Sequence, residues 1–166
     1  VWSALFKPMA DAQAAEAVEL RALAATLQWI FGRYTSRERA QWAVRRINVP
    51  AVRASFTKST IMAVALNWGN EGNQQALMEG YGWSEDQVMA ILSHLDAKDL
   101  ETVQMLWDAV DRYWPQIAAL QKEMTGLEPE RVTRVPSTIN GVAMKGGYYP
   151  LKYDTQTSFL AFQRDE

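Results

Sequence analysis

The sequence contains no cysteine and a single histidine, His94. The first absence excludes disulfides and thiolate metal sites, and it leaves the cellular compartment open. A single histidine excludes every metal site that is built from several histidines. No apolar run approaches the roughly 18 residues that a membrane-spanning helix needs. These absences predict a chain without a metal, a cofactor or a membrane-spanning segment.

Sequence signatures of catalysis are also missing. The chain has no Gly-x-Ser-x-Gly, no phosphate-binding loop and no dinucleotide fingerprint. Asp108 and Asp111 lie three apart on one predicted helical face, a spacing that suits acid–base or metal chemistry. They have no histidine or glycine-rich loop beside them, so a solvated or Arg112-paired face is favoured. We therefore predict no catalytic residue.

What the chain does contain is apolar and unevenly charged. Its 166 residues suit one ordinary domain, and seven tryptophans indicate aromatic packing or an aromatic surface. Residues 33–58 carry seven basic side chains and one acidic, whereas residues 59–127 carry three basic and ten acidic. This polarity permits a basic face for phosphate, or two halves that attract each other.

Cap signals and apolar spacing predict a succession of helices. The first covers about 10–31. Thr35 and Glu38 form a capping-box pattern for a second helix, whose apolar stripe runs to Ile47. Further helices are expected to begin after caps at Thr57, Asn70, Ser84 and Asp96.

The last predicted helix contains a proline within an apolar seam. The seam alternates steps of three and four residues, as for packing along another long helix, through Leu100, Val103, Trp107, Val110, Trp114, Ile117, Gln121 and Met124. Pro115 cannot donate to the carbonyl of Asp111. We expect a kink there or two abutting helices, ending at Gly126.

The composition changes after Gly126. Residues 131–154 alternate β-branched and polar side chains, and Asn140-Gly141 is a strong hairpin-turn signal. This pattern predicts a β-hairpin of about 132–139 against 142–149. The expected fold is mainly α, with five to seven helices and a C-terminal β-hairpin extension. We assign residues 1–128 to the helical domain and 129–166 to the hairpin and an extended tail.

Three stretches carry a family resemblance: "ALNWGNEGNQQALMEGYGWSEDQVMAIL", "DAVDRYWPQIAALQKEMTG" and "GGYYPLKYD". They resemble a helical region of the very large polyvalent proteins of tailed phages and mobile elements, some of which are similar to virion-borne antirestriction proteins. The resemblance covers roughly residues 57–154. It implies that the chain is a fragment of such a protein and assigns no catalytic residue.

The stretch "NWGNEGN", residues 67–73, is rich in asparagine and glycine between two predicted helices. We interpret it as a corner in which glycines allow close approach and asparagines cap exposed backbone groups. Trp68 and Trp83 are then expected to pack toward the core. The alternative is a polar site for a sugar or nucleotide, formed by Asn67, Trp68, Asn70 and Asn73.

The basic segment offers a candidate nucleic-acid surface. Arg39, Trp42 and Arg46 share one face of the predicted second helix, and Arg45 flanks them. Guanidinium groups beside an indole can grip a phosphate backbone and stack on a base. The alternative is a solvated face, or one that is paired with the acidic middle of the chain.

The primary functional prediction is a non-enzymatic structural or interaction module of a large phage or mobile-element protein, delivered with or acting near DNA. The expected partners are other modules of the same long chain or other virion proteins, with DNA as a further candidate. The expected location is the virion, or the host cytoplasm after delivery. The alternative is a nucleic-acid-binding element using residues 33–58, and a sugar-binding or hydrolase-like site at 67–83 ranks last.

Overall fold

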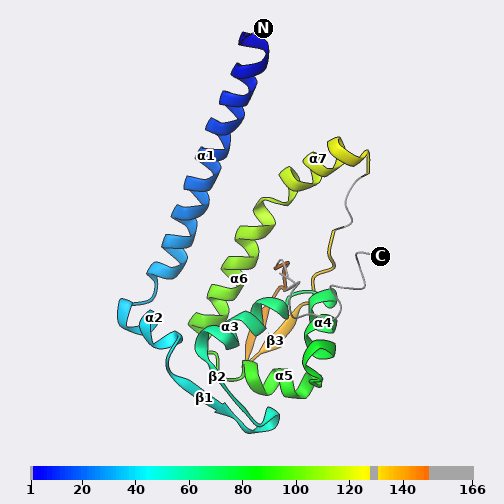
Figure 1. Ribbon diagram of the computed structural model, residues 1–166. Helices are drawn as coiled ribbons and strands as arrows, with labels where there is room; N and C mark the ends of the chain where they lie inside the picture. The colour runs from blue at the N-terminus through cyan, green and yellow to red at the C-terminus, as the bar shows by residue number, and fades with distance from the viewer. Residues whose placement is uncertain (1, 128–130, 150–166) are drawn as a thin grey trace.

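The computed structural model describes residues 2–127 and 131–149 (Figure 1). These residues form seven α-helices, one 3-10 helix and two separate two-stranded antiparallel sheets. The fold is therefore mainly helical with a C-terminal β-hairpin, as the sequence predicts. The elements are α1 (Trp2–Gly32), α2 (Ser36–Trp42), β1 (Arg46–Val49), the 3-10 helix η1 (Pro50–Val52), β2 (Ala54–Thr57), α3 (Lys58–Asn67), α4 (Glu71–Tyr81), α5 (Glu85–Leu92), α6 (Ala97–Arg112), α7 (Trp114–Thr125), β3 (Ser137–Ile139) and β4 (Val142–Met144).

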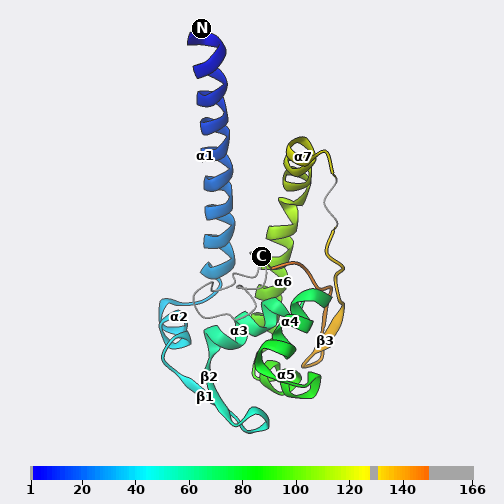
Figure 2. The same cartoon turned by 45° about the vertical axis from the view of Figure 1, so that its right-hand side comes forward.

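Helix α1 projects from the rest of the molecule. It includes the predicted range 10–31 and begins further toward the N-terminus. Both ribbon views show it beside the other helices only at its C-terminal end (Figures 1 and 2). At that end Ile30 and Tyr34 are buried, and Arg33 pairs with Glu101 of α6. The last turn of α1 thus attaches the helix to the body.

The segment after α2 differs from the sequence prediction. The Thr35–Glu38 capping box is present, but α2 ends at Trp42, and Arg46 begins strand β1. The predicted helical face of Arg39, Trp42 and Arg46 is therefore wrong. Residues 46–49 instead pair with 54–57 in a short hairpin, because alternating β-branched and polar residues can bury one side on the core. The alternation appears in the structure, where Val49 is buried and Asn48 exposed.

Helix caps were predicted well. Side chains of Thr57, Asn70, Ser84 and Asp96 each accept a backbone N–H three residues later, at the starts of α3, α4, α5 and α6. Such caps satisfy backbone donors that have no partner within the helix. The break at Pro115 is also confirmed, because α6 and α7 abut at Tyr113.

The predicted C-terminal hairpin is present and packs on the body. Ile139 pairs with Val142, so Asn140 and Gly141 form a two-residue turn in which both have positive φ, 49° and 79°. This is the geometry that Asn-Gly favours. Ile139 and Met144 are buried. The strands are three residues each, shorter than predicted, since the flanking chain bonds to other parts of the fold.

The core lies around α3, which packs against α4, α5, α6 and β2, while β4 of the C-terminal hairpin packs on α6. Five of the ten α3 residues are buried. From α6, the seam residues Leu100, Val103 and Trp107 enter this core. The seam therefore packs mainly into the central core near the start of α6. Beyond it, Met124 is strongly exposed.

Three glycines and a tryptophan meet where the C-terminal segment crosses the α3–α4 corner. A Cβ on Gly69 would lie 2.5 Å from both the carbonyl oxygen of Gly147 and the ring of Trp107. A Cβ on Gly147 would lie 2.3 Å from the Cβ of Trp107. The carbonyl of Gly69 accepts hydrogen bonds from the backbone N–H groups of Val135, at 3.0 Å, and Gly147, at 2.8 Å. We call Gly69, Gly146, Gly147 and Trp107 the glycine junction.

We predict that Gly69→Ala lowers the free energy of unfolding, as measured by urea denaturation. The expected loss is about 1–3 kcal/mol, typical of overpacking in a close-packed interior. Gly80→Ala is the matched control, because a Cβ on this α4 residue would meet nothing within 4 Å. It should raise stability by about 0.5–1 kcal/mol through helix propensity. Equal midpoints for the parent and the Gly69 variant would contradict the role of the junction.

Candidate functional site

The asparagine-rich corner uses its amides to hold its own chain. Asn70 is 1% exposed; its Oδ1 accepts from the N–H of Asn73 at 2.9 Å, and its Nδ2 donates to the carbonyl of Gly147 at 3.3 Å. Asn73 Nδ2 donates to the carbonyl of Tyr149 at 2.8 Å. These bonds fasten residues 147–149 across the start of α4.

The remaining side chains of this corner also contact other parts of the chain. Asn67 donates to the carbonyl of Ala63 at 2.9 Å, and Trp68 is 3% exposed. Trp83 is half-buried and stacks on Tyr81 with ring centroids 4.4 Å apart. The corner interpretation is confirmed. The polar-site interpretation of Asn67, Trp68, Asn70 and Asn73 is weakened, because the side-chain amides of the three asparagines donate to the chain itself and Trp68 is buried.

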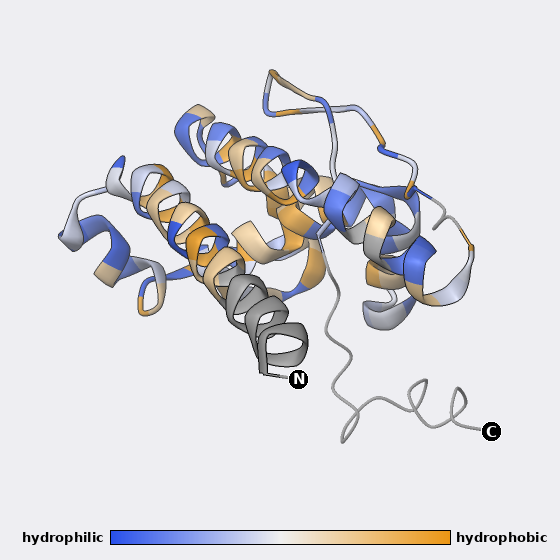
Figure 3. Cartoon of the chain, turned by 90° about the horizontal axis from the view of Figure 1, so that it is seen from above, coloured by the Kyte–Doolittle hydropathy of each residue, from blue (hydrophilic) through white to orange (hydrophobic). Residues whose placement is uncertain are grey.

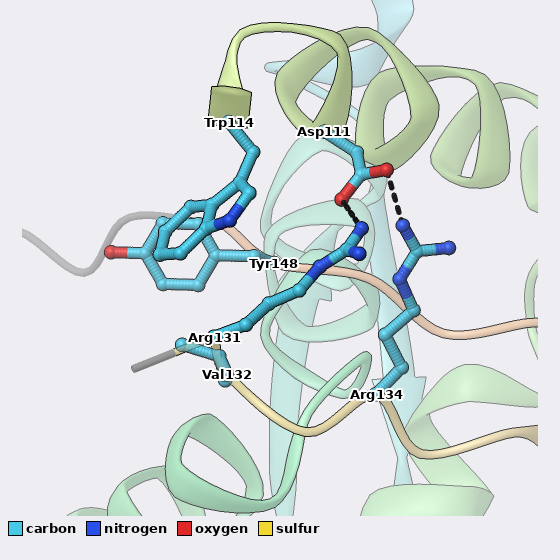
Figure 4. Close-up of a pocket in the computed structure, with 6 residues that line it drawn as sticks. All are labelled: Asp111, Trp114, Arg131, Val132, Arg134 and Tyr148. Atoms are coloured by element: carbon cyan, nitrogen blue, oxygen red, sulfur yellow. Dashed lines mark hydrogen bonds and ion pairs between the residues drawn. The ribbon is translucent and has the colours of Figure 1, made fainter. Parts of the chain in front are cut away.

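Asp111 pairs with two arginines from the segment before β3 rather than with Arg112. Arg131 donates to its Oδ1 at 2.7 Å, and Arg134 contacts its Oδ2. Hydrogen bonds from Arg134, and then from Arg131, hold the pKa of this carboxyl below its usual range. Figure 4 shows the two guanidinium groups on opposite oxygens of one carboxylate.

The space around this ion-pair cluster is too small for a substrate. Trp114, Val132 and Tyr148 complete its lining, and the cavity measures about 10 Å³, roughly enough for one water. Asp108 accepts from the side chain of Gln104 at 3.0 Å and lies outside the cluster. Asp108 and Asp111 therefore bind different partners, and Asp111 ties residues 131–134 to α6.

A second ion pair joins the basic and acidic halves of the chain. Lys58 Nζ lies 2.8 Å from Oδ1 of Asp99, whose side chain is 1% exposed. The hydroxyl of Tyr34 lies 3.0 Å from the same oxygen, and burial is the main cause that raises the pKa of this tyrosine. Together with the Arg33–Glu101 pair, this contact confirms that part of the basic segment serves to attract the acidic half.

Other arginines of the basic segment are not used in this way. Within residues 2–127 and 131–149, four of them make no side-chain hydrogen bond or ion pair, and all four are exposed: Arg37, Arg45, Arg46 and Arg53. Arg39 makes one long bond, 3.4 Å, to the carbonyl of Phe31. We call α2, β1, η1 and β2 the basic lobe. Figure 1 shows its hairpin at one end of the molecule, where the carbonyl of Ala51 accepts from the side chain of Gln87 of α5 at 3.0 Å.

A groove lies between the basic lobe, the start of α3 and the end of α5. Its volume is about 400 Å³, and it is lined by Glu38, Gln41, Trp42, Arg45, Ile47, Lys58 and His94. Of the predicted nucleic-acid residues, Trp42 and Arg45 come together here, whereas Arg39 and Arg46 do not line it. Lys58 and His94 were missed, because nothing in the sequence indicates that the ends of α3 and α5 meet α2.

Trp42 forms an aromatic wall of this groove in a fixed position. Its ring meets Tyr34 edge-on, with centroids 4.6 Å apart, and Lys58 Nζ lies 5.8 Å from its centroid. The hydroxyl of Ser59 donates to its carbonyl at 3.1 Å. Trp42 itself is half-buried. The groove therefore combines a held indole with cations, an arrangement that suits stacking and charge recognition.

The chain was compared with protein-family models, with curated proteins and with solved structures, and none of them matches it. None of the helices within the described residues is both long and apolar enough to cross a membrane. The same residues contain no cluster of three or more potential metal ligands. The geometry of the chain is therefore the basis for its functional interpretation.

We predict that Lys58→Met costs about 3 kcal/mol of unfolding free energy, because it leaves the buried Asp99 carboxylate without its cation. Lys58→Met combined with Asp99→Asn should recover most of this loss, since the amide carries no charge to strand. The four members of this double-mutant cycle can be compared by urea denaturation. A double variant no more stable than Lys58→Met would show that the pair is not the source of the effect.

Proposed function

We propose that the chain is a non-enzymatic interaction module of a large phage or mobile-element protein. It would be delivered with DNA or act near it, in the virion or in the host cytoplasm after delivery. The observation that supports this proposal best is α1, a 31-residue helix that projects from the body in the ribbon view and whose described side chains are buried at its C-terminal end, at Ile30 (Figure 1). A long helix that buries little of its apolar surface is well suited to receive a partner.

The outward side of α1 carries an apolar stripe. Val18, Ala22, Ala25 and Trp29 follow one another at steps of four, three and four, and all are exposed. Val18 is 61% exposed and Trp29 65%. Figure 3 shows much of this part of α1 in the colour of hydrophobic residues. Ile30 lies on another side of the helix, about a quarter turn from Trp29, and is buried against the body.

The spacing of this stripe favours a helix as its occupant. Steps of three and four place side chains in one seam, into which the side chains of a second helix can insert. Alanines between Val18 and Trp29 allow the two backbones to approach closely. The proposed partner is thus an amphipathic helix from another module of the same long chain or from another virion protein.

The non-enzymatic part of the proposal is supported by how the acidic groups are used. Asp99 and Asp111 form ion pairs, and Asp96 caps α6. The cavity beside Asp111 is too small for a substrate. These carboxylates have structural partners where a catalytic pair would need a reacting group between them.

We predict that Val18→Ser with Trp29→Ser leaves the unfolding free energy within about 0.5 kcal/mol of the parent, because both side chains are exposed. Ile30→Ala, the matched buried change on the same helix, should cost about 2–5 kcal/mol. In a second experiment, a photo-crosslinking side chain is placed at position 18 or 29 of the full-length protein that contains this chain. It should capture one helical segment outside residues 1–166. Mass spectrometry identifies the captured segment.

The same crosslinker at Glu79, an exposed residue of α4, is the control and should capture nothing specific. Equal capture from Glu79 and from the stripe would contradict the docking role of α1. Capture of a second copy of this chain alone would replace the proposed partner with self-association.

A second candidate function is nucleic-acid binding by the basic lobe. The specific observation is that Arg37, Arg45, Arg46 and Arg53 are exposed and make no ion pair within the described residues. Lys58, by contrast, is held by Asp99. Unpaired guanidinium groups gathered on one lobe are a suitable surface for phosphates.

For this candidate, Arg45→Glu with Arg46→Glu should abolish DNA and RNA affinity at about 50 mM salt, without unfolding the domain. Arg21→Glu with Arg112→Glu is the matched control, since it changes the charge equally at exposed positions outside the lobe. Gel shifts over a salt series measure both. The candidate should be dropped if the parent binds nothing at low salt, or if the two double variants bind equally.

A further inference from the structure

The groove beside the basic lobe presents polar side chains that the fold does not use. Within the described residues, Gln41, Arg45 and His94 line the groove, are exposed and make no side-chain hydrogen bond or ion pair. They come from α2, from the turn before β1 and from the end of α5. Three elements thus direct unpaired donors toward one space, with Trp42 as its aromatic wall.

The walls of this space are held before any ligand arrives. Trp42 is fixed by its edge contact with Tyr34 and by the bond from Ser59. Lys58 is held against Asp99 at 2.8 Å. The volume of about 400 Å³ lies within the range of pockets that bind small organic ligands, roughly 300–1,000 Å³. A fixed wall with free donors costs a ligand less entropy than a flexible one.

We propose that this groove binds one nucleotide unit of a single-stranded nucleic acid, with its base against Trp42 and its phosphate at Arg45. The proposal rests on the second candidate function and specifies it. Gln41 and His94 would contact the edge of the base or the sugar. Stacking on an indole tolerates every base, so the expected recognition is independent of sequence.

The surroundings of the groove favour a strand over a free nucleotide. Arg46 follows Arg45 directly on β1, and Arg53 lies where η1 meets β2. Both are exposed and outside the groove lining, so any phosphate they bind would belong to a unit outside the groove. In a duplex the bases are stacked and paired, and a base would have to leave the stack to reach Trp42.

The negative charge of Glu38 provides a second test, because its removal should strengthen binding where removal of the Arg45 charge weakens it. Its carboxylate lies in the groove lining, and hydrogen bonds from Thr35 are the main cause that lowers its pKa to about 2. It is therefore charged at neutral pH and repels a phosphate, although Lys98 at 3.2 Å offsets part of this charge. Glutamine preserves the capping box and removes the charge. Glu38→Gln should consequently strengthen binding.

The experiment measures the fluorescence anisotropy of a labelled 12-nucleotide thymidine strand, and of a 12-base-pair duplex, at about 50 mM salt. We expect the single strand to bind about 10-fold more tightly than the duplex. Arg45→Gln should weaken strand binding about 10-fold, and Glu38→Gln should strengthen it about 2-fold. Arg53→Gln, outside the groove, is the control and should weaken strand and duplex equally. Circular dichroism checks that each variant is folded.

The outcomes separate the groove from the wider function. If neither probe binds the parent, the second candidate function fails and the groove proposal with it. If both probes bind equally and Arg45→Gln behaves like Arg53→Gln, the lobe binds nucleic acid and the groove proposal is overturned. Thymidine monophosphate that competes as well as the strand would also overturn it, because the ligand would then be a free nucleotide. Trp42→Phe should weaken binding of the single strand more than binding of the duplex. If the Trp42 variant does not fold, the Arg45 and Glu38 variants still test the groove proposal.

Discussion

The carbonyl of Gly69 joins two distant parts of the chain and determines how the C-terminal segment is held. It receives backbone N–H groups from Val135 and Gly147, on either side of the β3–β4 hairpin. This approach is possible only because Gly69 and Gly147 leave room for the ring of Trp107 between them. Trp107 in turn donates to the carbonyl of Leu66 at 2.9 Å. The glycine-rich corner thus serves close packing of the chain on itself.

The basic lobe is attached by a different kind of contact. Lys58, the first residue of α3, reaches the buried Asp99 of α6, and Tyr34 closes over the same carboxylate. The cost of burying a charge without a partner favours this arrangement. It holds α2 and the β1–β2 hairpin beside the end of α5. Lys58 also lines the groove, together with Trp42 and His94.

Features that depend on neighbours in sequence could be predicted, whereas those that depend on distant neighbours could not. The caps at Thr57, Asn70, Ser84 and Asp96 and the turn at Asn140-Gly141 are local, and all are confirmed. Residues 40–47 fit a helical period, but the pairing of residues 46–49 with 54–57 took precedence after Trp42. The Asp111–Arg131 pair and the junction of Gly69 with Gly147 each need a tertiary fold to bring them together. The same is true of His94, so only Trp42 and Arg45 of the groove were anticipated.

Side chains that form no hydrogen bond, ion pair or core contact within the fold are the ones that can bind a partner. Asn70 and Asn73, which the sequence offered as candidate ligand-binding residues, are buried and form hydrogen bonds within the fold. The acidic side chains of α6 hold Arg33, Lys58 and Arg131. Among the side chains that remain exposed in the described residues are the apolar stripe of α1 and four arginines of the basic lobe without a hydrogen bond or ion pair, Arg37, Arg45, Arg46 and Arg53. The stripe suits a helix and the arginines a phosphate chain, and their separation on the molecule allows both to be occupied at once (Figure 2).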